Sequence, residues 1–190
     1  MGGGDKSLLE LDGQPVLSYV INRLRPQVDV VLLNANGDPA RFAEYGLPVL
    51  PDSMPDFPGP LAGILAGLDW AAEHGADTIV SVAADTPFFP PDLVVRLQQA
   101  ARQGGTRIAL AASPDPDRGL MRQPTFGLWP VALRQDLRAA LQGGLRKIVA
   151  WTDRHGAALA EFPAIPQDPF FNINTPQDMV QAERIIRAQG

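Results

Sequence analysis

The sequence predicts an α/β protein with a Rossmann-like, doubly wound and mostly parallel sheet, arranged in three α/β/α layers. Two observations lead to this fold class. Apolar, β-branched runs alternate along the chain with amphipathic segments of helical length, and strands separated by such helices favour parallel pairing. The chain has 190 residues, of which 45% are hydrophobic, and this is enough for one domain with a sizeable core. We therefore expect residues 1–190 to form a single domain.

Strands and helices alternate most regularly up to about residue 112. The first helix carries Val16, Val20 and Leu24 on one stripe, and Pro15 at an early position suits a helix start. The strands are apolar runs that end at polar or turn residues, as buried strands do. The elements expected in order are helix 15–25, strand 28–33, strand 47–50, helix 61–73, strand 78–84, helix 91–102 and strand 107–112.

The alternation weakens in the rest of the chain. Residues 113–123 are polar and contain prolines, so we expect a mobile loop there. The last helix has a clear start, because Thr175 can cap it, Pro176 suits its first position and Asp178 follows three residues after the cap. The elements expected in order are strand 125–129, helix 131–141, helix 147–154, strand 158–162 and the helix that begins at Pro176.

Composition excludes several classes of function. A net charge of -5 argues against a general nucleic-acid-binding surface. The chain has no cysteine, which excludes disulfides and thiolate metal sites, and its two histidines, His74 and His155, are too few for a multi-histidine centre. No apolar run approaches the length of a membrane span. We expect a cytoplasmic monomer that does not bind membranes.

Polar residues follow three of the expected strands. Asn34, Asp52 and Asp85 each lie at the carboxyl end of a strand, where ligands bind in doubly wound sheets. We expect all three to face one crevice, together with the glycine-rich start of the chain that leads to Lys6. Asn34 could contact a base edge or a ribose, and Asp52 could orient a ribose hydroxyl or a metal. In isolation, a turn residue explains each of them better than a ligand contact does.

Asp85 is the candidate metal ligand. A carboxylate at the end of a buried strand is well held and open to water on one side, and Mg²⁺ prefers one or two carboxylates plus phosphate oxygens. A turn at Asp85-Thr86-Pro87 explains the residue as well as a metal does. Lys6 could clamp a phosphate, and the alternative is an exposed lysine near the end of the chain.

Two further segments could bind a ligand. Gly59-Pro60-Leu61-Ala62-Gly63 combines glycines, which allow close backbone approach, with a helix N-terminus that offers N–H groups; plain helix entry is the alternative. Asn172 and Asn174 occupy alternate positions of an extended segment, so their side chains should point the same way. Local capping is the alternative for this pair.

Together these pieces resemble the molybdenum cofactor guanylyltransferases, the MobA family. The combination and its order are specific, although each piece alone is not, and it spans almost the whole chain. The matching residues run in the order Met1 to Lys6 with Leu8-Leu9-Glu10-Leu11-Asp12-Gly13, Asn34-Ala35-Asn36, Asp52-Ser53, Asp56-Phe57-Pro58-Gly59-Pro60-Leu61-Ala62-Gly63, Asp85-Thr86-Pro87-Phe88-Phe89-Pro90-Pro91-Asp92-Leu93, Gln123-Pro124-Thr125 and Asn172-Ile173-Asn174-Thr175-Pro176.

The resemblance implies transfer of GMP from GTP to molybdopterin, or to its molybdenum-bearing form, with release of pyrophosphate. It implies a nucleotide half over about residues 1–112 and a pterin-acceptor half over about residues 113–190. It also implies Mg²⁺ as cofactor and transient contacts with proteins of cofactor biosynthesis. The residues it assigns to GTP are Lys6, Asn34, Asp52, Asp85, Gly59, Pro60 and Gly63, with Lys6 and Asp85 catalytic and Asp85 holding the metal. The residues it assigns to the pterin are Gln123, Pro124, Thr125, Asn172 and Asn174.

The sequence departs from the family pattern at two places. The family begins with a strand and a glycine-rich loop ahead of the position of Met1, so we expect the natural protein to start further upstream. Gln123 stands where many relatives have a histidine, and glutamine cannot titrate near neutral pH. Two enzymatic alternatives remain, a transferase that uses CTP for the pterin and one that activates a sugar phosphate. A third is a non-catalytic pterin-binding or partner protein that has lost its nucleotide loop.

Overall fold

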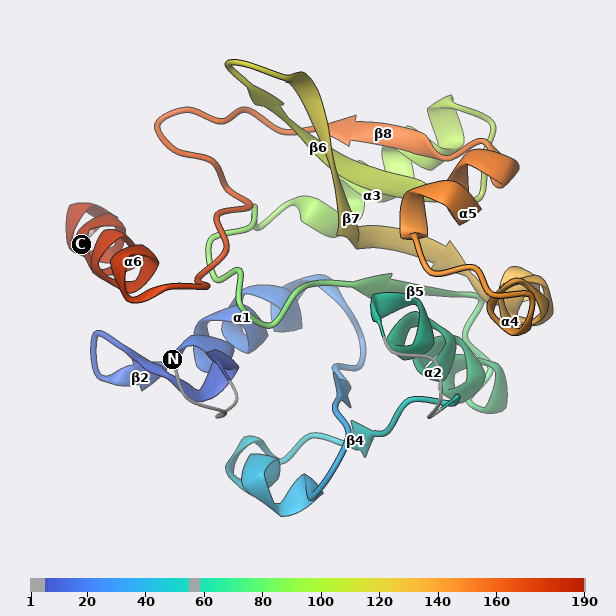
Figure 1. Ribbon diagram of the computed structural model, residues 1–190, viewed down its shortest axis with the longest axis horizontal. Coiled ribbons are helices and arrows are strands. Elements are labelled where there is room, and N and C mark those ends of the chain that lie inside the picture. Colours follow the sequence, from blue (N-terminus) through green and yellow to red (C-terminus); the bar gives the residue numbers. More distant parts are fainter. Residues whose placement is uncertain (1–5, 55–58, 190) are drawn as a thin grey trace.

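The computed structural model describes residues 6–54 and 59–189, and it confirms the α/β class (Figure 1). The main sheet has four strands in the order β5–β7–β6–β8. Its strands are β5 (Thr78–Ser81), β6 (Ala109–Asp115), β7 (Gly119–Pro130) and β8 (Ala158–Glu161). β6 and β8 are parallel, whereas β7 runs antiparallel to both β5 and β6. The sheet is therefore mixed, because the long strand β7 returns between two neighbours.

Helices cover both faces of this sheet, so the expected three layers are confirmed. The alternation along β6 shows it: Ala109 and Ala111 join the core cluster on one face, and Leu110 joins the cluster on the other. The first face packs against α1 (Val16–Leu24) and α3 (Leu93–Gln103). The second face packs against α2 (Pro60–Glu73), α4 (Arg134–Gln142) and α5 (Ile148–His155). Trp129 and Trp151 are fully buried in the second layer.

The prediction of a mobile loop over residues 113–123 is wrong. These residues form the ends of β6 and β7, which pair down to Asp115 and Gly119 in a hairpin. The carboxylate of Asp115 closes the turn, because its Oδ1 accepts the backbone N–H groups of Asp117 and Arg118 at 3.0 and 2.9 Å. Local side-chain hydrogen bonds of this kind satisfy a polar turn that composition alone assigns to a loop.

The pairing of β7 with β6 shifts its register near the middle of β7. Leu110 pairs with Gly127, but the next residue of β6, Ala111, pairs with Gln123. The intervening residues 124–126 bulge out of this ladder, and Pro124 has no N–H to donate to it. Thr125 turns to the other neighbour, since its carbonyl accepts the hydroxyl of Ser81 on β5 at 2.7 Å. The Gln123-Pro124-Thr125 segment thus lies where the β6–β7 pairing shifts its register.

Over residues 6–54, the strands that the structure describes are all short. β3 (Leu33–Asn34) and β4 (Val49–Leu50) form a parallel pair, and β1 (Glu10–Leu11) and β2 (Gln14–Pro15) form an antiparallel pair. The strand expected over residues 28–33 is reduced to its end, because the described chain offers residues 28–32 no ladder partner. 3-10 helices lie at Lys6–Leu8, Arg25–Gln27, Pro39–Tyr45 and Val131–Leu133.

A cavity of about 920 Å³ separates this part of the chain from the main sheet. Residues 28–34 line one side and residues 78–84 the other, with α1 and α2 contributing apolar side chains such as Leu17, Ile21 and Ile64. β3 and β5 therefore do not pair with each other. In Figure 1, β4 lies well away from the β5–β7–β6–β8 sheet.

The last helix, α6 (Pro176–Gln189), begins as predicted. The backbone N–H of Asp178 donates to Thr175 Oγ1 at 3.1 Å, and Asp178 Oδ2 accepts the N–H groups of Asn174 and Thr175 at 2.9 and 2.8 Å. The backbone hydrogen bond from Asn174, and after it the one from Thr175, lower the pKa of Asp178 below its ordinary value. Helix α6 packs against the start of the chain through a cluster that includes Leu11, Val16 and Ala182.

Within residues 6–54 and 59–189, no helix is both long enough and apolar enough to span a membrane.

Candidate functional site

Asn34 and Asp52 meet at the carboxyl ends of β3 and β4. Asn34 Nδ2 donates to Asp52 Oδ1 at 3.0 Å, and Asn36 Nδ2 donates to Asp52 Oδ2 at 2.8 Å. Asn36 also accepts the backbone N–H of Asp52 through its Oδ1 at 2.9 Å. Parallel pairing of the two strands brings these residues to one edge, as expected from their strand-end positions. Two amides thus fix the Asp52 carboxylate, a residue for which the sequence had also allowed a simple turn.

Gly63 lies directly against Asn34. A Cβ atom built on Gly63 would lie 2.1 Å from Asn34 Oδ1, closer than any side chain tolerates. Helix α2 begins at Pro60 with Gly59 as its N-cap, at a positive φ of 124° that favours glycine. The predicted helix entry is therefore present, and the glycine at position 63 is what lets the Asn34 amide approach this helix.

Asp85 lies in a second cluster, with Asn172. Thr86 stands between them: its Oγ1 is 3.2 Å from Asp85 Oδ1 and 2.5 Å from Asn172 Oδ1. The carbonyl of Asp85 accepts the backbone N–H of Ile173 at 2.9 Å. The predicted metal ligand and a predicted pterin ligand, far apart in sequence, are therefore fastened together by side-chain and backbone hydrogen bonds.

Lys6 and Asn174 extend this second cluster. Lys6 Nζ donates to Asn174 Oδ1 at 3.3 Å, and both side chains are exposed. Ile173 between the two asparagines is buried, so Asn172 and Asn174 share the outward side of the segment, as the alternate spacing predicts. The glycines ahead of Lys6, and residues 56–58 of the predicted stretch from Asp56 to Gly63, lie outside the described residues.

The expectation that Asn34, Asp52 and Asp85 face one crevice is met only for Asn34, because neither Asp52 nor Asp85 is among the described residues that line the cavity. Asn34, Pro60 and Gly63 line it on one side, and Ala83, Ala84 and Thr125 line it on the other. No hydrogen bond among the described residues joins Asn34 or Asp52 to Asp85. Two of the three strand-end residues, Asn34 and Asp52, are thus in direct contact with each other, while Asp85 follows β5 and contacts Thr86 instead.

Gln123 makes its described side-chain hydrogen bond away from the predicted pterin asparagines. Its Nε2 donates to Ser113 Oγ on the neighbouring strand β6 at 3.1 Å, and no hydrogen bond of the described chain links it to Asn172 or Asn174. Pro124 and Thr125 form the bulge described above, of which Thr125 faces the cavity. The prediction grouped these residues by resemblance, and their grouping with Asn172 and Asn174 stays a prediction.

The donor set at Asp85 fits one kind of metal site. Within the described chain, no group of three histidine, aspartate or glutamate side chains lies close enough to hold an ion on its own. Asp85 is a single, half-buried carboxylate just beyond the end of β5. Mg²⁺ is often held by one or two carboxylates together with substrate phosphates. Asp85 therefore fits a Mg²⁺ ion that is shared with a nucleotide, and it does not fit a metal centre built from protein ligands alone.

Comparison with known proteins decides the family. The family model described as "MobA-like NTP transferase domain" matches residues 1–158. The chain belongs to this family. A molybdenum cofactor guanylyltransferase of Bradyrhizobium sp. (strain ORS 278) is 53% identical over 188 residues, which cover 97% of this chain and 86% of the relative. The family predicted from the sequence is thus confirmed, and with it the assignment of the chain to the nucleotidyltransferases.

Solved structures share the fold of this MobA-like domain. Molybdopterin-guanine dinucleotide biosynthesis protein A from Archaeoglobus fulgidus superposes with a TM-score of 0.74 at 21% identity, over 98% of this chain and 92% of that one. The 4-diphosphocytidyl-2C-methyl-D-erythritol synthase from Anaerococcus prevotii gives a TM-score of 0.77 at 13% identity, over 97% and 94% of the two chains. At these identities the likeness concerns the fold alone.

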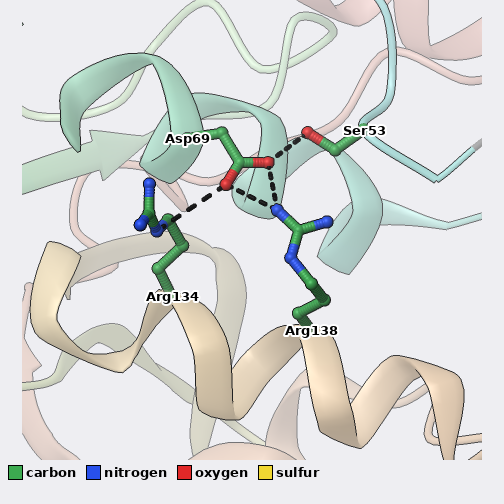
Figure 2. A network of polar contacts seen from close by, with 4 residues as sticks. All are labelled: Ser53, Asp69, Arg134 and Arg138. Atoms are coloured by element: carbon green, nitrogen blue, oxygen red, sulfur yellow. Dashed lines mark hydrogen bonds and ion pairs between the residues drawn. The ribbon is translucent and has the colours of Figure 1, made fainter. Parts of the chain in front are cut away.

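A polar network beside the MobA-like site has no counterpart in the sequence predictions. Figure 2 shows that the carboxylate of Asp69 on α2 contacts Ser53 and two arginines of α4. Ser53 Oγ donates to Asp69 Oδ2 at 2.6 Å, and Arg138 Nη2 lies 2.7 Å from both carboxylate oxygens. Arg134 Nε lies 3.8 Å from Asp69 Oδ1. The network ties the residue after Asp52 to the second half of the chain. Its sequence signal is an acid inside the apolar stretch of α2, away from the helix end where Glu73 lies.

Proposed function

We propose that this protein transfers GMP from GTP to molybdopterin, or to its molybdenum-bearing form, with release of pyrophosphate. The observation that carries the proposal is the identity of 53% to a molybdenum cofactor guanylyltransferase over 97% of the chain. The positions of Asn34 and Asp52, which are hydrogen-bonded to each other at the carboxyl ends of β3 and β4, support it, because nucleotides bind at this edge of doubly wound sheets. Asn34, Pro60 and Gly63 also line the cavity of about 920 Å³.

In the proposed reaction an oxygen of the pterin phosphate attacks the α-phosphorus of GTP. The bond between the α-phosphorus and the bridging oxygen breaks, and the leaving group departs as pyrophosphate. The protein supplies position and charge rather than a covalent intermediate. When bound at Asp85, Mg²⁺ would neutralise phosphate charge that develops as the leaving group departs. Lys6, which reaches the same cluster, would add a second cation.

We assign the residues on the β3–β4 side of the cavity to the nucleotide. Asn34 and Asp52 would orient the base or ribose, and Gly59, Pro60 and Gly63 would allow the phosphates close to the start of α2. Asn172, Asn174 and the Gln123-Pro124-Thr125 segment would contact the pterin. This division places the nucleotide half in about residues 1–112 and the acceptor half in about residues 113–190.

The direct test is product formation. The protein is incubated with molybdopterin, Mg²⁺ and GTP, CTP or ATP, and the pterin dinucleotide is measured by mass spectrometry with pyrophosphate release in parallel. We expect product with GTP. Product with CTP alone would replace the guanylyl assignment by the cytidylyl alternative. Absence of product with every nucleotide, while nucleotide or pterin still binds, would favour the non-catalytic alternative.

Two substitutions test the assigned roles. Asp85→Asn keeps the shape of the side chain and removes its charge, so we expect loss of Mg²⁺-dependent turnover; full activity would overturn the metal role. Lys6→Ala should lower the rate more than it weakens base discrimination, because Lys6 would act on phosphates that all nucleotides share. An unchanged rate would make Lys6 an ordinary exposed lysine.

A further inference from the structure

Thr86 contacts both the predicted metal ligand, Asp85, and a predicted pterin-binding residue, Asn172. It is fully buried, with 0% of its surface exposed. Its hydroxyl oxygen lies 3.2 Å from a carboxylate oxygen of Asp85 and 2.5 Å from the side-chain amide of Asn172. Sequence reasoning treats Thr86 as part of a turn. A buried hydroxyl needs hydrogen-bond partners. Here one partner, Asp85, is predicted to bind the metal, and the other, Asn172, is predicted to bind the pterin.

The hydroxyl has one proton to share between these two neighbours. An ionised carboxylate can only accept, and an amide can accept through Oδ1 or donate through Nδ2. If Thr86 donates to Asn172 Oδ1, Asp85 loses this hydrogen bond and Asn172 presents its N–H₂ group outward. If Thr86 donates to Asp85, the amide must rotate by about 180° to donate Nδ2–H to Thr86, and Asn172 then presents its oxygen outward.

The surrounding backbone keeps the three groups together in either arrangement. The carbonyl of Asp85 accepts the N–H of Ile173 at 2.9 Å, and the side chain of Ile173 is 1% exposed. The 172–174 segment therefore cannot move away from the 85–86 turn without breaking a hydrogen bond and exposing a core side chain. A change at Asp85 is met by reorientation of Thr86 and Asn172 instead.

We propose that Thr86 is a positioning residue that couples cation binding at Asp85 to acceptor binding at Asn172. A divalent cation satisfies Asp85, so the Thr86 hydroxyl turns to Asn172 Oδ1 and the Asn172 N–H₂ group faces the acceptor as a donor. Without the cation, Asp85 recruits the hydroxyl and Asn172 offers an oxygen, which an oxygen-rich, anionic acceptor does not bind. Cation and acceptor then strengthen each other's binding, and the coupling is reciprocal. This inference rests on the proposed function.

Two substitutions at Thr86 form a matched pair for the test. Thr86→Val removes the hydroxyl at nearly constant volume, and Thr86→Ser keeps it. Binding of Mn²⁺, as a probe for the divalent cation, is measured by electron paramagnetic resonance with the α,β-methylene analogue of GTP, with and without molybdopterin. We expect molybdopterin to lower the Mn²⁺ dissociation constant about five-fold or more in the wild type and in Thr86→Ser. In Thr86→Val we expect less than about a two-fold change, because the relay is interrupted.

Retained coupling in Thr86→Val, or no coupling in the wild type, would overturn the inference. If Thr86→Val does not fold, as judged by its urea transition, Asn172→Ala provides the second test. It removes the exposed partner, and it should keep Mn²⁺ binding while losing the response to molybdopterin. A wild type that forms no product with GTP contradicts the proposed function, whereas normal product formation with coupling intact in Thr86→Val contradicts only the role of Thr86.

Discussion

The two sides of the central cavity are built from similar apolar sequences but form different structures. On the side of the main sheet, β6 has 7 residues and β7 has 12, and both pair with neighbours along their length. On the other side, β3 and β4 have 2 residues each, although residues 28–33 are as apolar as a buried strand. The difference shows that an apolar run becomes a strand only where a partner edge completes its hydrogen bonds.

The candidate site spans this difference. Asp85, Thr86 and Asn172 are fastened to the well-paired sheet and to the segment before α6, whereas Asn34 and Asp52 belong to the short strands across the cavity. The residues assigned to the metal and to the acceptor are thus held both by the segment after β5 and by the segment before α6. The groups assigned to nucleotide recognition depend on their own local network of amides and on the Ser53–Asp69 contact.

Gly127→Ala should give the largest effect, because it tests the packed side. A Cβ atom there would lie 2.3 Å from the Trp129 ring and 3.0 Å from a methyl group of Leu110. Trp129 is fully buried and cannot move aside. We expect a loss of about 3 kcal/mol in the free energy of unfolding, the upper part of the usual range for overpacking. Urea denaturation measures it, and a loss below about 1 kcal/mol would show that this side is not tightly packed.

Asp136→Ala should cost somewhat less. Asp136 Oδ1 accepts the indole N–H of buried Trp151 and contacts His155 Nε2, each at 2.8 Å. Alanine leaves the indole donor without its acceptor, for which we expect a loss of about 1–3 kcal/mol in urea denaturation. Asp136→Asn is the matched control, because its amide oxygen can still accept from Trp151. Equal losses in both variants would mean that charge, and not the indole hydrogen bond, matters.

The contacts of Asp136 with Trp151 and His155 predict that the free energy of unfolding depends on pH. The hydrogen bond from Trp151, followed by the interactions with His155, holds the pKa of Asp136 below its ordinary value of 3.8. A carboxyl whose pKa is lowered by folding stabilises the native state above the unfolded pKa, and this contribution is lost as pH falls through the folded pKa. The Asp136 side chain is 54% exposed, so the contribution is small. The stability difference between wild type and Asp136→Asn should shrink as the pH falls below about 4. A difference that stays the same or grows below that pH would contradict this.

Thr175→Ala tests the start of α6, the helix that packs against the first part of the chain. Loss of the cap that receives the Asp178 N–H should cost about 1 kcal/mol. Thr175→Ser retains the hydroxyl and should stay close to wild type. Equal stability of the two variants in urea would indicate that the Asp178 carboxylate, which accepts the neighbouring N–H groups, is sufficient to hold this helix end.

Gly67→Ala should give the smallest effect, because it tests the cavity side with the same chemical change as Gly127→Ala. The new Cβ would lie 2.9 Å from the end of the Ile79 side chain, and both residues line the cavity, so Ile79 has room to turn. The helix preference of alanine over glycine, about 1 kcal/mol, works in the opposite direction. We expect a net change within about 1 kcal/mol of wild type. A loss comparable to that of Gly127→Ala would break the comparison between the two sides.

Sequence reasoning found the elements that local signals define. The stripe of α1, the Pro60 start of α2 and the Thr175–Asp178 cap all depend on residues close in sequence. It missed what depends on distant partners: the hairpin closed by Asp115, the antiparallel course of β7 and the reduction of strand 28–33 to its end. Within the site, the pairing of Asn34 with Asp52 followed from strand-end positions. The roles of Thr86 and Asp69 could not follow, because their partners lie on other elements.

The most direct test of the guanylyltransferase account is a thermal melt of this chain with Mg²⁺ and GTP, CTP or ATP in turn. A ligand that binds the native state raises its stability, by about 2.7 kcal/mol at a concentration 100 times its dissociation constant. The account predicts a cooperative melt that GTP shifts upward more than CTP or ATP does, with the shift reduced in Asp85→Asn. A melt that responds to none of the nucleotides, or more to CTP than to GTP, would contradict it.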